Sequence, residues 1–313
     1  MKEKYLVTGG AGFIGSHMVE WLLHERKAVR ILDNFSTGKR ENLAPFLNEI
    51  EVVEGDIVAP EDCAKAMEGI THVLHLAAQA SVVRSVEAPM ETHEINATGT
   101  VQLLEVARKK KVRAFALAST CAVYGQEAKL PIEETSVPAP LSPYATSKLA
   151  AEEYVRLYRA LFDVPGVIFR LFNVYGPRQD PSSPYSGVIS AFADRLSRKE
   201  PGTIYGDGTQ TRDFVFVKDV VRFFGLAAQK PALFSGRVYN VASGKQLSIL
   251  KLYEILAAMS GQSVTPRMAP ARAGEVRHSC GSVGSLEAAV GASEMARCIE
   301  FAQGIAETLK AYK

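Results

Sequence analysis

The sequence predicts an α/β protein, built on a doubly wound parallel sheet and completed by a smaller C-terminal lobe. Short apolar runs alternate with helical patterns through the first part of the chain, which is typical of a parallel sheet with helices on both faces. After Gly176, prolines and glycines break this alternation into loops and short elements. The length of 313 residues suits one large α/β domain or one domain with a smaller lobe.

Each expected strand is a short apolar run between turn signals. The strands are expected at residues 5–7, 29–32, 50–53, 72–75, 114–118 and 166–171. Longer segments with helical spacing predict helices at residues 14–25, 90–110 and 144–161. The lysines at residues 109–111 are expected to be a solvated helix end, where cations suit the helix dipole.

Composition excludes several function classes. The net charge of +2 gives no indication of a nucleic-acid partner. No segment approaches the roughly 20 apolar residues that span a bilayer, and no leader-type stretch is expected at the N-terminus. Cys63, Cys121, Cys280 and Cys298 are scattered without metal-site spacing. We therefore expect a cytoplasmic protein with reduced thiols, no metal and no membrane or nucleic-acid partner.

A glycine motif directly follows the first expected strand and opens the first expected helix. Gly9, Gly12 and Gly15 are spaced as in a Rossmann-type dinucleotide site. Glycine permits the tight turn, the approach of the backbone to a pyrophosphate and the packing of helix on strand. The helix N-terminus then offers N–H groups to the phosphates. The alternative is an ordinary glycine-rich turn.

The second expected strand ends at Asp33, where an acid can hydrogen-bond the adenosine ribose 2′-hydroxyl. A carboxylate there repels a 2′-phosphate, which favours NAD over NADP. Lys39 and Arg40 follow closely and are able to bind such a phosphate, so tolerance of NADP stays open. A solvated loop aspartate is the alternative interpretation.

Two further strand ends carry residues suited to a cofactor. Asp56 and Ile57 follow the third strand and are placed to flank an adenine ring, although an ordinary polar turn explains them almost as well. Leu76, Ala77 and Ala78 follow the fourth strand, and small residues there let a ribose lie against the chain. Small residues also occur at many strand ends.

A Tyr-x-x-x-Lys pair suggests proton transfer. Tyr144 and Lys148 lie one helical turn apart and share a helix face. A neighbouring ammonium favours the phenolate, so we expect a lowered pKa for Tyr144 and a usable base near neutral pH. Thr120, just past the fifth strand, supplies a hydroxyl for the same substrate oxygen.

The remaining polar candidates have structural interpretations. His75 and His278 are expected to be structural or peripheral. Asp219 is expected to be the N-cap of a helix, because it stands at the start of a helical pattern.

These motifs together resemble the nucleotide-sugar epimerase/dehydratase family, the extended short-chain dehydrogenases/reductases. The resemblance covers nearly the whole chain and is closest to 4-epimerases of UDP-glucose and UDP-N-acetylglucosamine. The matching segments are VTGGAGFIGSH, LDNFSTG, GDI, HLAA, STCAVYG, SPYATSK, RLFNVYGPRQDP, YGDGTQTRDFVFVKDV, NVASG and RAGEVRHS. The resemblance implies an NAD-binding Rossmann domain at residues 1–176, to which some later segments return. It also implies that residues 177–313 form mainly the UDP-sugar lobe.

The resemblance also implies roles for individual residues. Catalysis is assigned to Thr120, Tyr144 and Lys148. The implied NAD contacts are Gly9, Gly12, Phe13, Ile14, Gly15, Asp33, Asn34, Phe35, Ser36, Thr37, Gly38, Asp56, Ile57, Leu76, Ala77, Ala78, Ala80, Tyr144, Lys148 and Phe172. The implied substrate contacts are Ser81, Thr120, Tyr144, Asn173, Val188, Arg212, Arg272, Glu275 and Ser279.

Two departures from family patterns narrow the activity. Sugar-nucleotide dehydratases carry an acidic pair or a Glu after the catalytic Thr, and this chain has Cys121 and Ala122 there. Those side chains cannot act as acid and base for loss of water. In the epimerases, the position of Ser279 is bulky where only plain hexoses are accepted, so this serine leaves room for an N-acetyl group.

The resulting hypothesis is reversible epimerisation at C4 of a UDP-hexose through a 4-keto intermediate with tightly bound NAD. UDP-glucose/UDP-galactose, and UDP-GlcNAc/UDP-GalNAc, are the expected substrates. The alternatives are a UDP-glucuronate epimerase or decarboxylase, a nucleotide-sugar 4-ketoreductase, and a non-catalytic NAD(H) sensor. A homodimer joined through residues 90–110 and 144–161 is expected, although the apolar residues of these helices, such as Leu103, Leu104 and Tyr154, are able to serve the sheet instead.

Overall fold

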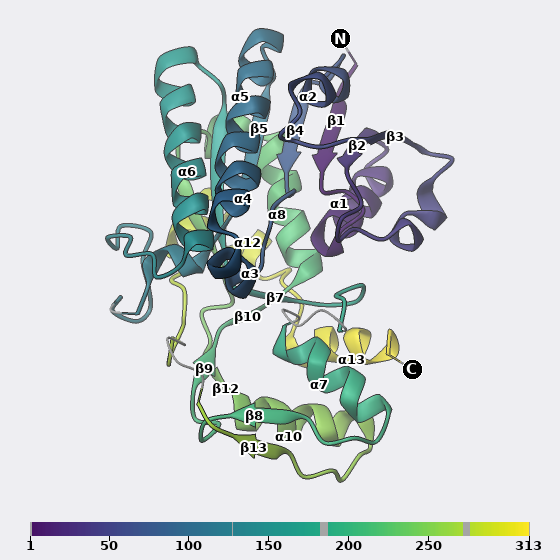
Figure 1. The fold of residues 1–313 in the computed structure, drawn as a ribbon, viewed down its shortest axis with the longest axis vertical. Coiled ribbons are helices and arrows are strands. Elements are labelled where there is room, and N and C mark those ends of the chain that lie inside the picture. The colour runs from purple at the N-terminus through teal and green to yellow at the C-terminus, as the bar shows by residue number, and fades with distance from the viewer. Residues whose placement is uncertain (1, 127, 182–186, 272–275, 313) are drawn as a thin grey trace. The chain divides into compact units, whose positions relative to one another are not determined.

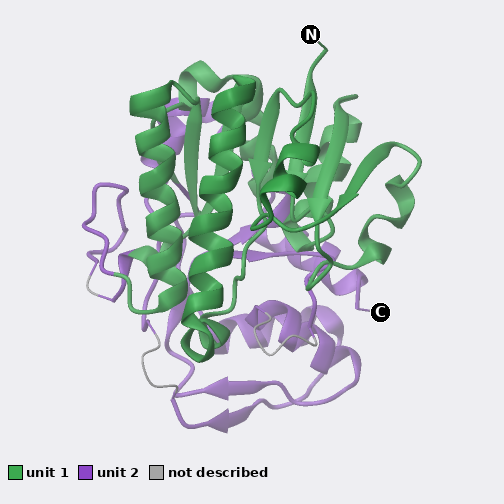
Figure 2. Ribbon diagram, turned by 45° about the horizontal axis from the view of Figure 1, so that its top comes forward, with its two compact units in different colours: residues 1–123, 140–170, 220–239 green, residues 124–139, 171–219, 240–313 purple. Residues whose placement is uncertain are grey.

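The structure is a computed structural model that describes residues 2–126, 128–181, 187–271 and 276–312. The chain divides into two compact units (Figure 2). Unit 1 comprises residues 1–123, 140–170 and 220–239, and unit 2 comprises residues 124–139, 171–219 and 240–313. The chain therefore passes between the units several times. The expected assignment of cofactor and substrate to either side of residue 176 stays a prediction.

Unit 1 is organised around a seven-stranded sheet in the described part of the chain (Figure 1). Its strands are β1 (Lys4–Thr8), β2 (Ala28–Asp33), β3 (Ile50–Glu54), β4 (His72–His75), β5 (Ala114–Thr120), β6 (Gly166–Leu171) and β11 (Val238–Val241). Their order is β11-β6-β5-β4-β1-β2-β3. β1 pairs in parallel with β2 and β4, as do β2 with β3 and β4 with β5. This order is the doubly wound order of dinucleotide-binding folds with β11 added beside β6.

Helices follow most of the strands. They are α1 (Phe13–His24), α2 (Pro60–Ala66), α3 (Val82–Glu87), α4 (Pro89–His93), α5 (Gly99–Lys110), α6 (Pro143–Phe162), α8 (Val217–Gln229) and α9 (Pro231–Phe234). Short 3-10 turns occur at η1 (Arg40–Asn42), η2 (Ala44–Phe46) and η4 (Cys121–Tyr124). A π-helical segment, η3 (Glu94–Thr98), joins α4 to α5.

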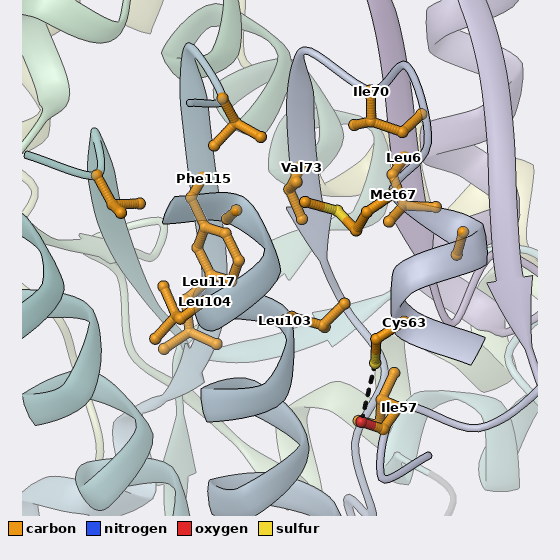
Figure 3. Close-up of a cluster of buried hydrophobic side chains, with 14 of the residues drawn as sticks. Leu6, Ile57, Cys63, Met67, Ile70, Val73, Leu103, Leu104, Phe115 and Leu117 are labelled. Atoms are coloured by element: carbon orange, nitrogen blue, oxygen red, sulfur yellow. Dashed lines mark hydrogen bonds between the residues drawn. The ribbon is translucent and has the colours of Figure 1, made fainter. Parts of the chain in front are cut away.

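One face of the sheet buries a hydrophobic cluster under α2, α5 and α6 (Figure 3). Leu6, Val73 and Phe115 come from the strands, Met67 is the C-cap of α2, and Leu103 comes from α5. All five side chains are fully buried. Because side chains alternate along a strand, the next residue on each strand faces the opposite helix layer.

That opposite layer contains α1 and α8. Phe169 of β6 packs on Phe224 of α8 with ring centroids 4.6 Å apart. A Cβ on Gly225 would lie 2.2 Å from the indole of Trp21, so a glycine is required for α8 to approach α1 this closely. The sheet is thus covered on both faces, as a parallel sheet requires.

The predicted strands all form, and their ends move by two residues at most. The predicted helices 14–25 and 144–161 correspond to α1 and α6. The prediction of a single helix over residues 90–110 was wrong in one respect, because the π-helical segment η3 interrupts it. The basic run does close α5, with Lys111 as its left-handed C-cap.

Unit 2 holds smaller elements. They are β7 (Asn173–Tyr175), α7 (Val188–Ser197), β8 (Thr203–Tyr205), β9 (Thr211–Arg212), β10 (Phe214–Phe216), β12 (Leu247–Ser248), α10 (Ile249–Ser260), β13 (Arg267–Ala269), α11 (Gly284–Val290), α12 (Ala292–Met295) and α13 (Phe301–Lys310). The strands pair two by two, as β7 with β10, β8 with β13 and β9 with β12. Tyr175, Phe216 and Phe301 form an aromatic cluster beside α13.

Asp219 is not the predicted N-cap. It lies inside α8, which begins at Val217, and its Oδ2 accepts a hydrogen bond from Ile299 N at 3.0 Å. The carboxylate therefore fixes a distant loop of unit 2. Within the described residues, none of the helices combines the length and apolar character needed to cross a bilayer.

Replacing Phe115 with alanine should destabilise unit 1 by about 3–5 kcal/mol, because a fully buried aromatic ring leaves a cavity. Chemical denaturation followed by circular dichroism measures the loss. Leu47→Ala is a suitable control, since Leu47 is 51% exposed and its truncation should cost little. Equal effects of the two substitutions would contradict the packing described.

Candidate functional site

The turn between β1 and α1 accepts only glycine at two positions. Gly9 has φ +67°, and a Cβ there would lie 2.8 Å from Ala77 N. A Cβ on Gly15 would lie 1.9 Å from the carbonyl oxygen of Gly9. Gly12 provides the N-cap of α1 without a side chain, and the first turn of the helix contains no acid. The result is a bare helix N-terminus, with Phe13 and Ile14 in its first turn, that fits the diphosphate of a dinucleotide.

Asp33 fixes the loop that follows β2 against this turn. Its two carboxylate oxygens accept hydrogen bonds from Ala11 N and Phe35 N, each at 2.8 Å. The side chain is 7% exposed, and burial raises its pKa above the ordinary value. Arg40, a candidate partner of a 2′-phosphate, stacks on Phe35 at 4.0 Å and pairs with Glu54 at 2.6 Å.

The loop from residue 34 to 38 continues this arrangement. Asn34 is exposed and donates to Asp56 Oδ2 at 2.7 Å, while its own Oδ1 accepts from Ser36 N at 3.0 Å. Thr37 is exposed, and Gly38 lies against Ala11, where a Cβ would come within 2.8 Å of the alanine Cβ. The predicted cofactor residues after β2 and β3 are therefore brought together.

Ile57 lies differently from its neighbour Asp56. Its side chain belongs to the buried cluster of unit 1, and its carbonyl accepts a bond from Cys63 Sγ at 3.2 Å (Figure 3). A side chain in this position packs against Gly99. Contact of Ile57 with a cofactor would therefore involve its backbone.

A buried histidine shapes the chain after β4. His75 Nδ1 lies 2.7 Å from Thr8 Oγ1, and its Nε2 lies 3.0 Å from Thr100 Oγ1. Thr8 Oγ1 also accepts from the N–H groups of Leu76 and Ala77, both at 3.2 Å. Burial lowers the pKa of His75 to about 3, so the ring is neutral. The expected structural role of His75 is confirmed.

The rest of this loop leads into α3. Ala78 is partly buried and Ala80 is exposed. Ser81, expected at the substrate, is buried, and its Oγ accepts from Arg84 N at 3.0 Å as the N-cap of α3.

Asn96 was missed by the sequence analysis. It accepts from Gln79 N at 2.8 Å, donates to Gln79 O at 3.0 Å and donates to Ser147 Oγ at 3.0 Å. It thereby ties the loop after β4 to the helix that carries Tyr144 and Lys148. Asn96 lies in the π-helical segment, and such bulges are frequent at functional sites. A polar residue inside an apolar helical pattern was the available signal.

Thr120 ends β5, and Tyr144 and Lys148 share one face of α6. The neighbouring Thr120 hydroxyl lowers the pKa of the Tyr144 phenol. Burial has the larger effect and raises the pKa of Tyr144 to about 12. The expected lowering was therefore wrong, because desolvation disfavours the phenolate more strongly than its neighbours stabilise it.

Lys148 is 3% exposed, and burial lowers its pKa to about 8, although the Glu152 carboxylate acts in the opposite direction. The ammonium therefore remains the main form at pH 7. Base action by Tyr144 near neutrality therefore requires further stabilisation of the phenolate.

In unit 2, three predicted substrate residues gather around Asp213. The backbone N–H and the Nδ2 of Asn173 both donate to the carbonyl of Asp213, at 3.0 and 2.9 Å. Arg212 precedes Asp213 and donates to the carbonyl of Arg277 at 3.3 Å. Ser279 N donates to the carbonyl of Thr211 at 3.2 Å.

Asp213 itself was not singled out from the sequence. It is fully buried and accepts from Ser243 N and Oγ at 2.7 Å, from Gly244 N at 3.0 Å and from Gly281 N at 3.1 Å. Burial raises its pKa. A lone acid before the apolar run 214–217 was the signal, since a buried carboxylate needs several donors.

Ser279 is 7% exposed, and its Oγ is buried with no hydrogen-bond partner among the described residues. Val188 opens α7 and is partly buried. Phe172 is buried, and a Cβ on Gly281 would lie 2.7 Å from its ring. Arg272 and Glu275 lie outside the described residues.

One negative finding holds for the part of the chain that the structure describes. It contains no group of three or more His, Cys, Asp and Glu side chains suited to a metal ion. His278 is exposed and lies 3.0 Å from Thr211 Oγ1, in agreement with its expected peripheral place.

Comparisons with known proteins agree with this geometry. The sequence profile of the NAD dependent epimerase/dehydratase family matches residues 5–242. A UDP-glucose 4-epimerase of Mycolicibacterium smegmatis is 41% identical over 278 residues, which cover 88% of each chain. A structure of UDP-N-acetylglucosamine 4-epimerase from Methanobrevibacter ruminantium, in complex with UDP-N-acetylmuramic acid, has a TM-score of 0.93 and 34% identity. The matched region covers 100% of this chain and 99% of the chain in that structure. A Thermus thermophilus UDP-glucose 4-epimerase in complex with NAD has a TM-score of 0.89 and 38% identity, with 99% and 98% covered.

The buried histidines should make the protein less stable as pH falls below about 6.5. His75 stays neutral when folded but binds a proton when unfolded, so stability present above pH 6.5 is lost as pH falls toward its folded pKa of about 3. His72, whose pKa burial lowers to about 4, adds to the effect. On acidification from pH 7.5 to pH 5, the free energy of unfolding should fall in both proteins. In His75→Asn the fall should be about 2 kcal/mol smaller than in the wild type.

Urea denaturation at both pH values measures this difference. His24→Asn is the matched control, because His24 is exposed, and it should keep the wild-type response. If His75→Asn lost stability on acidification as steeply as the wild type, His75 would not be a neutral buried group.

Proposed function

Because this chain belongs to the NAD dependent epimerase/dehydratase family, we propose that it catalyses reversible epimerisation at C4 of UDP-hexoses. The observation that carries the proposal is the combination, in unit 1, of a glycine turn with Thr120, Tyr144 and Lys148. UDP-glucose/UDP-galactose is the first expected pair, and UDP-GlcNAc/UDP-GalNAc the second. Purified protein given these sugars and UDP-glucuronate, with products resolved by NMR, tests the assignment. Product from UDP-glucuronate alone would contradict it.

The cofactor fits the residues present. The turn leaves no room for a Cβ at Gly9 or Gly15, as a closely held diphosphate requires, and Asp33 ends β2 beside it. When bound, NAD supplies reversible acceptance of the C4 hydride. We assign its diphosphate to the start of α1 and its adenosine to Asp33 and Asp56. The remaining part of NAD is assigned to Leu76–Ala80, Lys148 and Phe172.

The protein's own groups move and hold a proton. Tyr144 removes the proton from the sugar 4-hydroxyl and later returns it to the oxygen of the 4-keto sugar. Thr120, whose hydroxyl influences the Tyr144 phenol, orients the same oxygen. Lys148 is assigned the role of supplying positive charge on the same helix face, since a neighbouring cation favours a phenolate. Since the proton is returned, the cycle has no net consumption of acid or base.

The UDP portion of the substrate is assigned to residues of unit 2. Asn173 and Arg212 offer amide and guanidinium donors to the diphosphate, and guanidinium suits phosphate oxygens well. Arg272, Glu275 and Val188 are assigned to the UDP portion, and Ser81 to the sugar. A cytoplasmic location is part of the proposal and is supported by the four cysteines, none of which forms a disulfide in the described chain.

Tyr144→Phe should fold normally and lose about 10²–10⁴-fold in turnover, since it removes only the proton-transfer hydroxyl. Epimerisation of UDP-glucose, followed by NMR, measures the loss. Tyr154→Phe, on the same helix and 41% exposed, should keep full activity. Near-native turnover of Tyr144→Phe would show that the assigned base is wrong.

Ser279→Tyr should distinguish the two substrate pairs. The buried hydroxyl of Ser279 has no protein partner in the described chain, which supports a place beside a ligand group. A tyrosine would fill the space that an N-acetyl group needs, and overpacking costs about 1–3 kcal/mol. Activity on UDP-GlcNAc should therefore fall about one to two decades more than activity on UDP-glucose. Equal changes in kcat/KM for both sugars would remove the N-acetyl assignment.

We further propose a homodimer formed through α4, η3, α5 and α6. Leu103 and Leu104 are fully buried in unit 1, so they cannot serve the contact. Exposed apolar side chains on α6 and α4, among them Leu157 at 49%, Leu161 at 68% and Met90 at 79%, support it instead.

Light scattering should therefore find a dimer at micromolar concentration, and Leu161→Glu should shift it toward monomer. Leu233→Glu is the control, because Leu233 is similarly exposed (52%) but lies on α9. A wild-type monomer would eliminate the proposed contact.

A further inference from the structure

A buried ion pair lies beside the candidate catalytic residues and has none of the roles assigned above. Arg170 Nη2 and Glu152 Oε2 are 2.6 Å apart, and the two side chains are 1% and 0% exposed. Arg170 Nε donates to both carboxylate oxygens at 3.0 and 3.2 Å. Ser119 Oγ also donates to Glu152 Oε1. The carboxylate is therefore enclosed and held from two directions.

The three residues come from the elements that carry the proton-transfer group. Ser119 immediately precedes Thr120 at the end of β5. Glu152 lies one helical turn after Lys148 and two turns after Tyr144, on the same face of α6. Arg170 lies on β6, the strand next to β5. The ion pair thus joins two strand ends to the catalytic helix.

The charge of Glu152 acts on Lys148. Burial lowers the pKa of Lys148, and the carboxylate raises it again, leaving it at about 8. His75 of β4 also lies in the field of Lys148 but is neutral, and Cys121 influences Tyr144 rather than Lys148. Without the anion, the lysine would lose protons at lower pH.

A purely structural ion pair is the alternative. Buried pairs are costly to desolvate, and apolar pairs of similar volume often replace them without loss of stability. A structural role would therefore change folding or overall rate without moving the pH dependence of proton transfer. The two roles differ in a measurable way.

We propose that Glu152, fixed by Arg170 and Ser119, is a positioning residue that keeps Lys148 charged and aligned with Tyr144 during proton transfer at the sugar. The inference rests on the proposed function, since proton transfer at C4 is the step it serves. Glu152 acts through Lys148 and is not assigned a contact with substrate.

The principal test compares Glu152→Gln with Glu153→Gln. Glu153 is the adjacent residue, exposed and paired with Arg156 at 3.1 Å, so its substitution controls for removal of one charge from α6. On the alkaline side of the pH profile, kcat/KM for UDP-glucose should fall at a pH about one unit lower in Glu152→Gln than in the wild type. Glu153→Gln should keep the wild-type profile. A lower rate with an unmoved alkaline limb in Glu152→Gln would overturn the proposal.

A second variant guards against misfolding, because Glu152→Gln leaves Arg170 buried with reduced compensation. The double variant Glu152→Leu with Arg170→Met removes both charges and keeps apolar volume. Circular dichroism and thermal unfolding should find it folded, and its alkaline limb should shift in the same direction. A folded double variant with a wild-type pH profile would also overturn the proposal.

A readout independent of turnover separates this inference from the proposed function. Lysine labelled with carbon-13 at Cε allows NMR titration of Lys148, whose resonance is identified by its loss in Lys148→Arg. The titration should move about one pH unit lower in Glu152→Gln. A shifted titration in a protein without epimerase activity would overturn the proposed function alone. Epimerase activity with an unshifted titration would overturn the role of Glu152.

Discussion

Parallel pairing in the centre of the sheet is the constraint on which the candidate site of unit 1 depends. Thr8 of β1 is in register with Leu32 of β2 and with His75 of β4, and His75 is in register with Leu117 of β5. The carboxyl ends of these strands therefore meet at one edge of the sheet. The glycine turn, Asp33, the loop after His75 and Thr120 all leave from that edge, as ligand sites in doubly wound sheets do.

The edge is made rigid by buried polar groups whose partners are supplied by the backbone. Asp33 binds two N–H groups, and Thr8 accepts from the loop after β4 while His75 fixes Thr8 itself. Asp213 plays a comparable part in unit 2, with donors from two loops. Each group would be costly if it were unpaired. Loops that have no regular secondary structure are thus held by polar residues with no assigned part in proton transfer.

Much of the fold was predictable because each strand, turn and helix is specified mainly by residues that lie close together in the sequence. Apolar runs and a glycine turn specify a strand, a turn and a helix within about 20 residues, so β1 and α1 were predictable. The π-helical segment was not, because it depends on Asn96 meeting Gln79 and Ser147 from elsewhere in the chain. Asp219 was misassigned for the same reason, since its partner Ile299 lies 80 residues away.

The pKa values of the site residues were even harder to predict from the sequence, because they depend on burial. Spacing alone put Lys148 beside Tyr144 and suggested a lowered phenol pKa, but the sign is decided by burial, which a sequence does not reveal. In the structure, burial pushes both groups toward their neutral forms, raising the pKa of Tyr144 and lowering that of Lys148. A site built this way needs charge from outside the Tyr-Lys pair. Glu152 supports the ammonium, and a phenolate additionally requires positive charge close to Tyr144. The reactivity of the pair is therefore a property of its surroundings rather than of the motif.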